Sequence, residues 1–294
     1  MALTDDDLPA LFRAADQNSL DAQQRFLLSL RVQLGLLVGA AIGGALTWRL
    51  GSSQADWAGI AAAVAFVLAA LLRIDLLRSR PERTWYDGRA AAESAKTLAW
   101  RYGVGGEPFR PDVLGDPEAD RLFIARLNDI LKDLRGIHLV PAGGTGDQIT
   151  PAMKDLRKSL LDDRKHAYET GRIEDQQAWY AKKARWNEQR ARAWNGLMLG
   201  LEAIGVVGAI LKATATIEAD ILGITGAAVA GAAAWLQAKQ HLNLASAYSV
   251  ASQELASIKA LVDQPSTDEE WARFVDQAEE AISREHTLWR ASHS

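Results

Sequence analysis

The sequence of 294 residues contains no cysteine, so it can form no disulfide and no thiolate metal site. It also has little net charge, a formal −4, which argues against nucleic-acid binding through bulk positive charge. The N-terminal stretch carries Asp5, Asp6 and Asp7 and has no early apolar core, so it does not have the pattern of a cleavable secretory signal. The helix-forming and apolar segments are therefore the most informative features of the sequence.

The chain also lacks the side-chain arrangements that are typical of active sites. Its five histidines show no metal-ligand spacing, and no Ser/His/Asp set or carboxylate pair has a catalytic context. The stretch GGTGD at 143–147 lacks the Lys-Ser/Thr of a phosphate-binding loop and follows no convincing strand, so we interpret it as a linker. We expect no enzyme activity and no cofactor.

The stretch Trp194–Lys239 contains two apolar runs. Glu202 is the single charge between Gly196 and Leu211, and none occurs between Ile221 and Ala238. A spanning helix needs roughly 20 apolar residues, with about 17 as the lower end. The runs are joined by a short polar connector, which predicts a helical hairpin that crosses a bilayer twice. The alternative is an Ala/Gly-rich core of a soluble protein.

A second hairpin is expected earlier in the chain. Uncharged runs lie between Arg31 and Arg49 and between Asp56 and Arg73. Aromatic residues at the ends of apolar runs suit a membrane interface. Tryptophans stand at these ends in both hairpins: Trp48, Trp57, Trp194 and Trp235. We place the hairpins at about 31–78 and 194–239.

Small residues recur at spacing four in both hairpins. In lipid such ladders let helix backbones approach closely, whereas each glycine inside a soluble helix costs about 1 kcal/mol relative to alanine. This favours membrane spans over a soluble core. The glycines expected in helix packing are Gly35, Gly39, Gly43, Gly196, Gly200, Gly223 and Gly231.

Basic residues gather on the terminal side of both hairpins. Arg25, Arg31, Arg73, Arg78, Arg80 and Arg83 flank the first, and Lys182, Lys183, Arg185, Arg190, Arg192 and Lys239 flank the second. The positive-inside rule then predicts cytoplasmic termini and a cytoplasmic central region.

Glu202 is the one charge well inside an apolar run. Intramembrane carboxylates tend to face a pore, a proton path or a partner, and Glu202 with Thr225 is our candidate for such a polar position. Snorkelling of Glu202 to the cytoplasmic surface is an equal alternative, because the residue lies about a third of the way into the run.

Two stripes of tryptophan and charge lie outside the apolar runs at helical spacing. The first is Trp85, Arg89, Glu93, Lys96 and Trp100, and the second is Trp179, Lys183, Trp186, Arg190 and Trp194. Helical spacing places each set on one face. Intrahelical ion pairs between packing tryptophans are the simpler interpretation. A cytoplasmic contact surface or a basic ligand pocket is the alternative.

The remaining segments read as helices and caps. Helices are expected at 5–30, 84–102, 118–135 and 152–194, the last continuing into the third apolar run, and another follows Lys239 to about Val262. Thr4 with Asp7, and Ser266 or Thr267 with Glu269 or Glu270, have the spacing of N-terminal caps.

Four stretches of this sequence resemble the DUF4231/SLATT proteins. They are ERTWYDGRAAAESAKTLAWRY (82–102) after one hairpin, RIEDQQAWYAKKARWNEQRARAW (172–194) before the other, QITPAMKDLRKSLLDDRKHAYETGR (148–172) and EEAISREHTLWRA (279–291). The resemblance covers nearly the whole chain as two units in tandem. We divide it into a first unit at 1–140, a linker at 141–151 and a second unit at 152–294.

The resemblance implies a two-transmembrane effector in a bacterial, nucleotide-linked conflict system. We therefore expect an all-α integral membrane protein of the bacterial inner membrane, with four spans, long cytoplasmic helices and a cytoplasmic sensor protein or nucleotide signal as partner. Two functions fit: a pore-forming or channel-like homo-oligomer, or a non-conducting membrane scaffold that docks a cytoplasmic partner. No nucleic-acid partner is expected.

Overall fold

The computed structural model describes residues 2–46, 48–49, 55–134 and 146–291, and these ranges contain helices and no strand. Part of the expected linker, 141–145, lies outside them. A short 3-10 helix (Asp5–Asp7) comes first. The α-helices are α1 (Ala10–Ala45), α2 (Trp57–Ser79), α3 (Pro81–Val104), α4 (Asp116–Asp133), α5 (Pro151–Lys158), α6 (Leu161–Tyr168), α7 (Asp175–Ala213), α8 (Ile221–Lys239), α9 (His241–Lys259) and α10 (Asp268–Ala291). A π-helical turn, Glu169–Glu174, joins α6 to α7.

The described residues form two compact units, and both halves of the chain contribute to each. Unit 1 contains Met1–Gln23, Glu82–Ala184 and Ser246–Ser294, and unit 2 contains Gln24–Pro81 and Arg185–Ala245. Helices α1, α7 and α9 pass from one unit into the other. The chain therefore passes from one unit to the other several times.

Unit 1 has a buried aromatic core. Trp100, Tyr168 and Trp271 are almost fully buried, and Tyr168 makes edge-to-face contacts with both tryptophans at centroid distances of 5.8 and 5.7 Å. The indole of Trp271 donates to the carbonyl oxygen of Val104 at 2.8 Å, which satisfies its polar atom inside the core. Unit 1 thus buries its aromatic side chains in an interior core, as water-soluble helical domains do.

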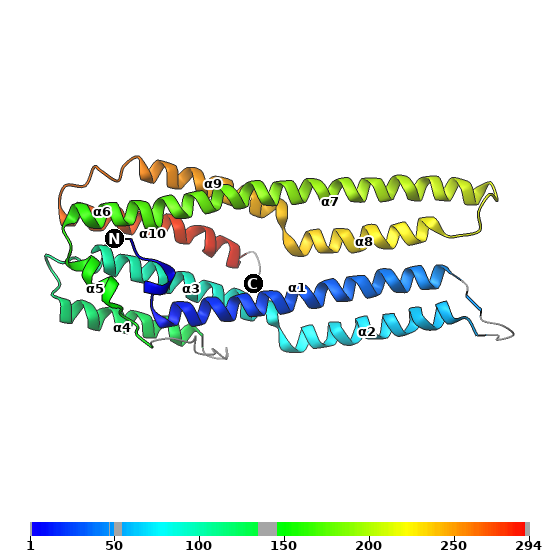
Figure 1. Cartoon of the computed structure of the whole chain (residues 1–294), viewed down its shortest axis with the longest axis horizontal. Coiled ribbons are helices and arrows are strands. Elements are labelled where there is room, and N and C mark those ends of the chain that lie inside the picture. The colour runs from blue at the N-terminus through cyan, green and yellow to red at the C-terminus, as the bar shows by residue number, and fades with distance from the viewer. Residues whose placement is uncertain (1, 47, 50–54, 135–145, 292–294) are drawn as a thin grey trace. The chain divides into compact units, whose positions relative to one another are not determined.

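Unit 2 has the opposite distribution, because large apolar side chains of α2 and α7 face outward. Phe66, Leu71 and Leu199 are more than half exposed. Among the described residues, four helices are long and apolar enough to cross a membrane, and the apolar runs of the sequence lie in α1, α2, α7 and α8. In Figure 1, α1 runs beside α2 and α7 beside α8, so each pair forms one of the expected hairpins.

In both hairpins the second helix has the same kind of N-terminal and C-terminal cap. The second helix of each begins at an aspartate: Asp56 accepts from the Ala58 amide at 3.1 Å, and Asp220 accepts from the Gly223 amide at 3.4 Å. Each ends at a left-handed residue, Arg80 at φ 43° and Gln240 at φ 48°. Asp at the first position and a left-handed residue at the last are the ordinary start and stop of a helix.

Several boundaries confirm the sequence interpretation and others correct it. The helix expected at 5–30 is interrupted between Asp7 and Ala10, and the helix expected at 152–194 is interrupted between Lys158 and Leu161. The Thr4–Asp7 pair caps the 3-10 helix, and the Thr267 hydroxyl accepts from the Glu270 amide at 3.2 Å in front of α10. Residues 161–213 run without interruption into the third apolar run. The helix after Lys239 is not continuous, because Gln240 ends α8 and a new helix begins at His241. Neither glycine nor proline marks this break, so the sequence did not reveal it.

Candidate functional site

Glu202 lies on the outside of the second hairpin. Its side chain is exposed on α7, and within the described residues no hydrogen bond or ion pair to it is seen. The same face carries Asn195, Leu199 and Val206, all exposed, at helical spacing. Thr225 is buried in α8 and its hydroxyl donates to the Ile221 carbonyl at 2.9 Å. The structure therefore separates the two polar positions that the sequence grouped.

The predicted packing glycines divide into contacting and open positions. A side-chain carbon at Gly43 would lie 3.1 Å from the Ala62 Cβ, and one at Gly231 would lie 3.1 Å from a Val38 methyl. At Gly35, Gly39, Gly196 and Gly200 it would meet nothing within 4 Å, and at Gly223 it would meet only the capping Asp220. The sequence missed Gly205 and Gly208, where a side-chain carbon would lie 2.6 Å from the Thr225 hydroxyl oxygen and 2.5 Å from the Ile221 Cβ of α8.

The residues of the first tryptophan-and-charge stripe make contacts with other parts of the same chain. Arg89 pairs with Glu93 at 2.6 Å and with Asp16 at 3.3 Å, and Lys96 pairs with Asp5 at 3.0 Å. Glu93 and Trp100 are 8% and 1% exposed, so neither is available to a partner, contrary to the contact-surface alternative. Trp85 is half-buried, and its carbonyl accepts from Ser19. The N-terminal segment packs over this face, which the spacing alone could not show.

The second stripe divides between the two units. Trp179 belongs to unit 1, where it packs against Tyr248 at a centroid distance of 5.3 Å and carries Lys183 over its ring. Trp186 and Arg190 belong to unit 2, and the Arg190 guanidinium lies 5.5 Å from the Trp186 ring centre. These two residues open onto a groove.

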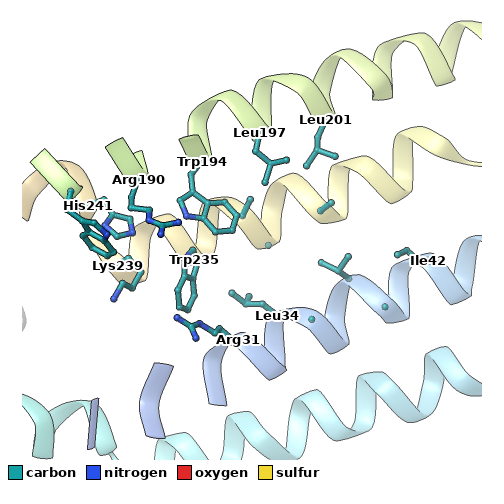
Figure 2. Close-up of a pocket in the computed structure, with 17 residues that line it drawn as sticks. Arg31, Leu34, Ile42, Arg190, Trp194, Leu197, Leu201, Trp235, Lys239 and His241 are labelled. Atoms are coloured by element: carbon teal, nitrogen blue, oxygen red, sulfur yellow. The ribbon is translucent and has the colours of Figure 1, made fainter. Parts of the chain in front are cut away.

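The groove lies inside unit 2 and has a volume of about 760 Å³. Figure 2 shows Arg31, Arg190, Lys239 and His241 at one end and aliphatic side chains from α1 and α7 along the rest. Trp235 points from α8 toward α1, where the Arg31 guanidinium lies 4.8 Å from its ring centre. The lining comprises Arg31, Leu34, Gly35, Val38, Gly39, Ile42, Trp186, Arg190, Trp194, Leu197, Leu201, Ala228, Gly231, Ala232, Trp235, Lys239 and His241.

Unit 1 holds a buried polar cluster that the sequence did not indicate. Glu279 is fully buried and accepts from Thr97 at 2.8 Å, from Tyr168 at 3.0 Å and from two nitrogens of Arg172 at 2.9 and 2.8 Å. Arg172 lies in the π-helical turn and is 1% exposed. Arg172 and Glu279 are 107 positions apart, and both fall in stretches that carry the family resemblance. The cluster joins α3, the π-helical turn and α10.

A second polar contact in unit 1 involves Asp120 on α4. Burial alone would raise the pKa of Asp120, but a hydrogen bond from Tyr102 at 2.5 Å and an ion pair with Lys154 at 3.0 Å lower it overall. A folded-state pKa below the unfolded one stabilises the fold above the unfolded value and is lost as pH falls through the folded value.

This sign predicts a pH-dependent effect of Asp120→Asn. At neutral pH the variant should melt at a lower temperature than the unaltered chain, and the difference should shrink below the ordinary aspartate pKa of 3.8. Thermal melts of the full chain in detergent across this pH range provide the measurement. Asp129→Asn is the control, because Asp129 is largely exposed and its ion pair with the exposed neighbour Lys132 should contribute little to stability. A melting difference that stays constant with pH would contradict the prediction.

Two family models match the chain in tandem. SMODS and SLOG-associating 2TM effector domain 3 (SLATT_3) matches residues 9–165, and SMODS and SLOG-associating 2TM effector domain 1 (SLATT_1) matches residues 168–289. The chain belongs to the SLATT family. No curated protein and no solved structure is found as a match.

Each SLATT domain supplies one hairpin, α1–α2 in the first and α7–α8 in the second, which agrees with the two transmembrane helices in the family description. The protein is thus a multi-pass, all-α membrane protein built from domains that act as effectors in conflict systems. The two matches meet near Tyr168, within the continuous helix 161–213. The expected linker at 141–151 stays a prediction.

Proposed function

We propose that this SLATT protein is a pore-forming effector of the bacterial inner membrane, in which several copies bring their Glu202 faces together around a water-filled path. The exposed position of Glu202 carries the proposal. At 1.5 Å per residue, the backbone of Glu202 lies ~12 Å along α7 from Trp194, about two fifths of the way through a hydrocarbon core about 30 Å thick. A glutamate side chain is too short to reach the interface from there.

The physical reason is the cost of an unpaired carboxylate in lipid. Ionisable residues inside membranes face a bundle interior or a water-filled cavity, where they mark ion paths. A single copy provides neither a bundle interior nor a water-filled cavity for Glu202, because the same face of α7 also carries the exposed Leu199 and Val206. Assembly of identical faces supplies both water and a ring of carboxylates, which is a common selectivity device of cation channels.

The charge distribution supports a cytoplasmic location for the termini, because the basic residues flanking both hairpins lie on the terminal side. Unit 1 would then lie in the cytoplasm, where its water-soluble type of core suits contact with a sensor protein or a nucleotide signal. Such a signal would change the assembly or opening of the spans.

Ion flux through liposomes that contain the purified full chain tests the proposal. The unaltered chain should conduct cations, and Glu202→Gln should reduce the flux on the order of tenfold, since a ring of charge concentrates counter-ions at least tenfold. Glu202→Lys should shift the reversal potential toward anion preference. Glu218→Gln, outside the apolar run in the α7–α8 connector, is the matched control and should leave the flux unchanged.

Flux that is insensitive to Glu202→Gln and Glu202→Lys would remove Glu202 from the path. A chain that inserts and assembles without any ion flux would instead favour a non-conducting membrane scaffold.

A further inference from the structure

The groove of unit 2 has a cationic end and an apolar body, and both belong to helices that cross the membrane. We propose that it binds one anionic phospholipid, with the phosphate held by Arg31, Arg190 and Lys239 and one acyl chain lying between α1 and α7. The proposal concerns the single chain and stands whether or not the protein conducts ions.

The cationic end has the composition of a phosphate site. Arg31 and Lys239 approach the same ring, with the guanidinium carbon 4.8 Å and the ammonium nitrogen 6.0 Å from the centre of Trp235. Arg190 approaches from α7, beside Trp186. None of the lining residues, all of which lie in the described part of the chain, is acidic. Basic pockets between membrane helices are suited to anionic headgroups.

The aromatic side chains fix the geometry of this end. Trp186 contacts the His241 ring at a centroid distance of 5.4 Å, and the His241 Nδ1 lies 2.7 Å from the Asn187 side-chain oxygen. Trp235 is 8% exposed, so its ring is held in place beneath Arg31. Tryptophan prefers the headgroup level of a membrane, which places the three cations where a lipid phosphate lies.

The apolar body has the length of one leaflet. From Arg31 to Ile42 the groove follows α1 for 11 residue steps, ~16 Å at 1.5 Å per residue, and half of a 30 Å hydrocarbon core is about 15 Å. Figure 2 shows Leu34 and Ile42 on α1 opposite Leu197 and Leu201 on α7. An acyl chain anchored at the cations would therefore end near the middle of the bilayer.

The open glycines on α1 agree with a slender occupant. No atom lies within 4 Å of a side-chain carbon built at Gly35 or Gly39, and both line the groove. A second copy of the chain would bring its charged helix ends to these cations only if its helices packed against the groove in one particular register. Every anionic lipid of the leaflet, in contrast, carries its phosphate at the depth of the cations. The charge and length together favour the lipid.

Native mass spectrometry of the purified full chain tests the proposal, with phosphatidylglycerol and phosphatidylcholine of identical acyl chains as probes. The unaltered chain should retain phosphatidylglycerol in preference. The triple variant Arg31→Gln, Arg190→Gln, Lys239→Gln should bind it more weakly on the order of a hundredfold, since each basic residue near an anionic headgroup contributes about fivefold. The triple variant Arg73→Gln, Arg78→Gln, Arg185→Gln removes the same charge from exposed residues that do not line the groove and should weaken binding much less than the groove variant does.

A steric variant tests the acyl path without changing charge. Gly39→Leu fills the groove and should reduce retention of phosphatidylglycerol, while Gly44→Leu, at an open position of the same helix outside the lining, should not. Circular dichroism of each variant establishes that the helices remain folded.

Three outcomes would overturn the proposal. They are equal retention of the two lipids by the unaltered chain, unchanged retention in the groove triple variant, and displacement of the lipid by inorganic phosphate alone. A change of oligomeric state in Gly39→Leu, with phosphatidylglycerol still retained, would assign the groove to a second copy instead.

Discussion

Replacing Glu279 by leucine is expected to lower the free energy of unfolding of unit 1 by about 3–5 kcal/mol, because it leaves the buried Arg172 charge uncompensated. Glu279 accepts hydrogen bonds from Thr97, Tyr168 and Arg172, and both members of the ion pair are almost fully buried. Native-state hydrogen exchange of the α3 and α10 amides in the full chain measures the free energy of opening at this site.

Two further variants separate the buried charge from the loss of a contact. Asp276→Asn breaks a partly exposed pair with Arg101, 2.8 Å long, and should cost only about 0–1 kcal/mol. The double variant Arg172→Met, Glu279→Leu removes both charges and should recover most of the loss, since apolar replacement of a buried pair is often neutral. Normal protection in Glu279→Leu would show that water reaches Arg172 in the folded chain.

This cluster also explains why the two SLATT domains share one core. Thr97 lies in the first family match, whereas Tyr168, Arg172 and Glu279 lie in the second. The pair between Trp271 and Val104 likewise joins the two matches through an indole hydrogen bond. Unit 1 is thus completed only when α3 from the first domain packs with α10 from the second, and Trp100 of the first match is buried against Tyr168 of the second.

The sequence predicted the features that depend on neighbouring residues. Both hairpins followed from apolar runs, and the Thr4–Asp7 and Thr267–Glu270 caps followed from spacing of three. Each of these features is decided within a few residues, so local periodicity and capping chemistry suffice. The Arg89–Glu93 pair belongs to the same class.

Features that depend on tertiary packing could not be predicted. Trp100 lies on the same helical stripe as Arg89 but is buried, because helices distant in sequence cover that part of α3. The groove requires α1, α7 and α8 to come together, and its cations are spread from Arg31 to Lys239. Helical spacing gives the face of a side chain, not the element that will cover it.

Packing in the second hairpin shows the same limit at the level of single glycines. Gly200 belongs to the ladder that the sequence identified, yet an added methyl group there meets nothing within 4 Å. Gly208 was not identified, yet its added methyl group would lie 2.5 Å from the Ile221 Cβ and 2.6 Å from the Ile221 Cγ2. The spacing of glycines therefore does not reveal which of them face the neighbouring helix.

Gly208→Ala is accordingly expected to destabilise the α7–α8 hairpin by about 1–3 kcal/mol, the usual cost of overpacking a close contact. The clash involves the Cβ of Ile221, which cannot rotate away, so relief requires the two backbones to separate. Gly200→Ala, on the same helix, should instead stabilise the hairpin by up to about 1 kcal/mol, because alanine forms helix better than glycine and no neighbour is displaced.

Unfolding by sodium dodecyl sulfate, followed by far-ultraviolet circular dichroism, should give a lower midpoint for Gly208→Ala and an equal or higher one for Gly200→Ala. Identical midpoints would mean that α7 and α8 do not pack at Gly208, and the closest contact within the second SLATT hairpin would have to lie elsewhere.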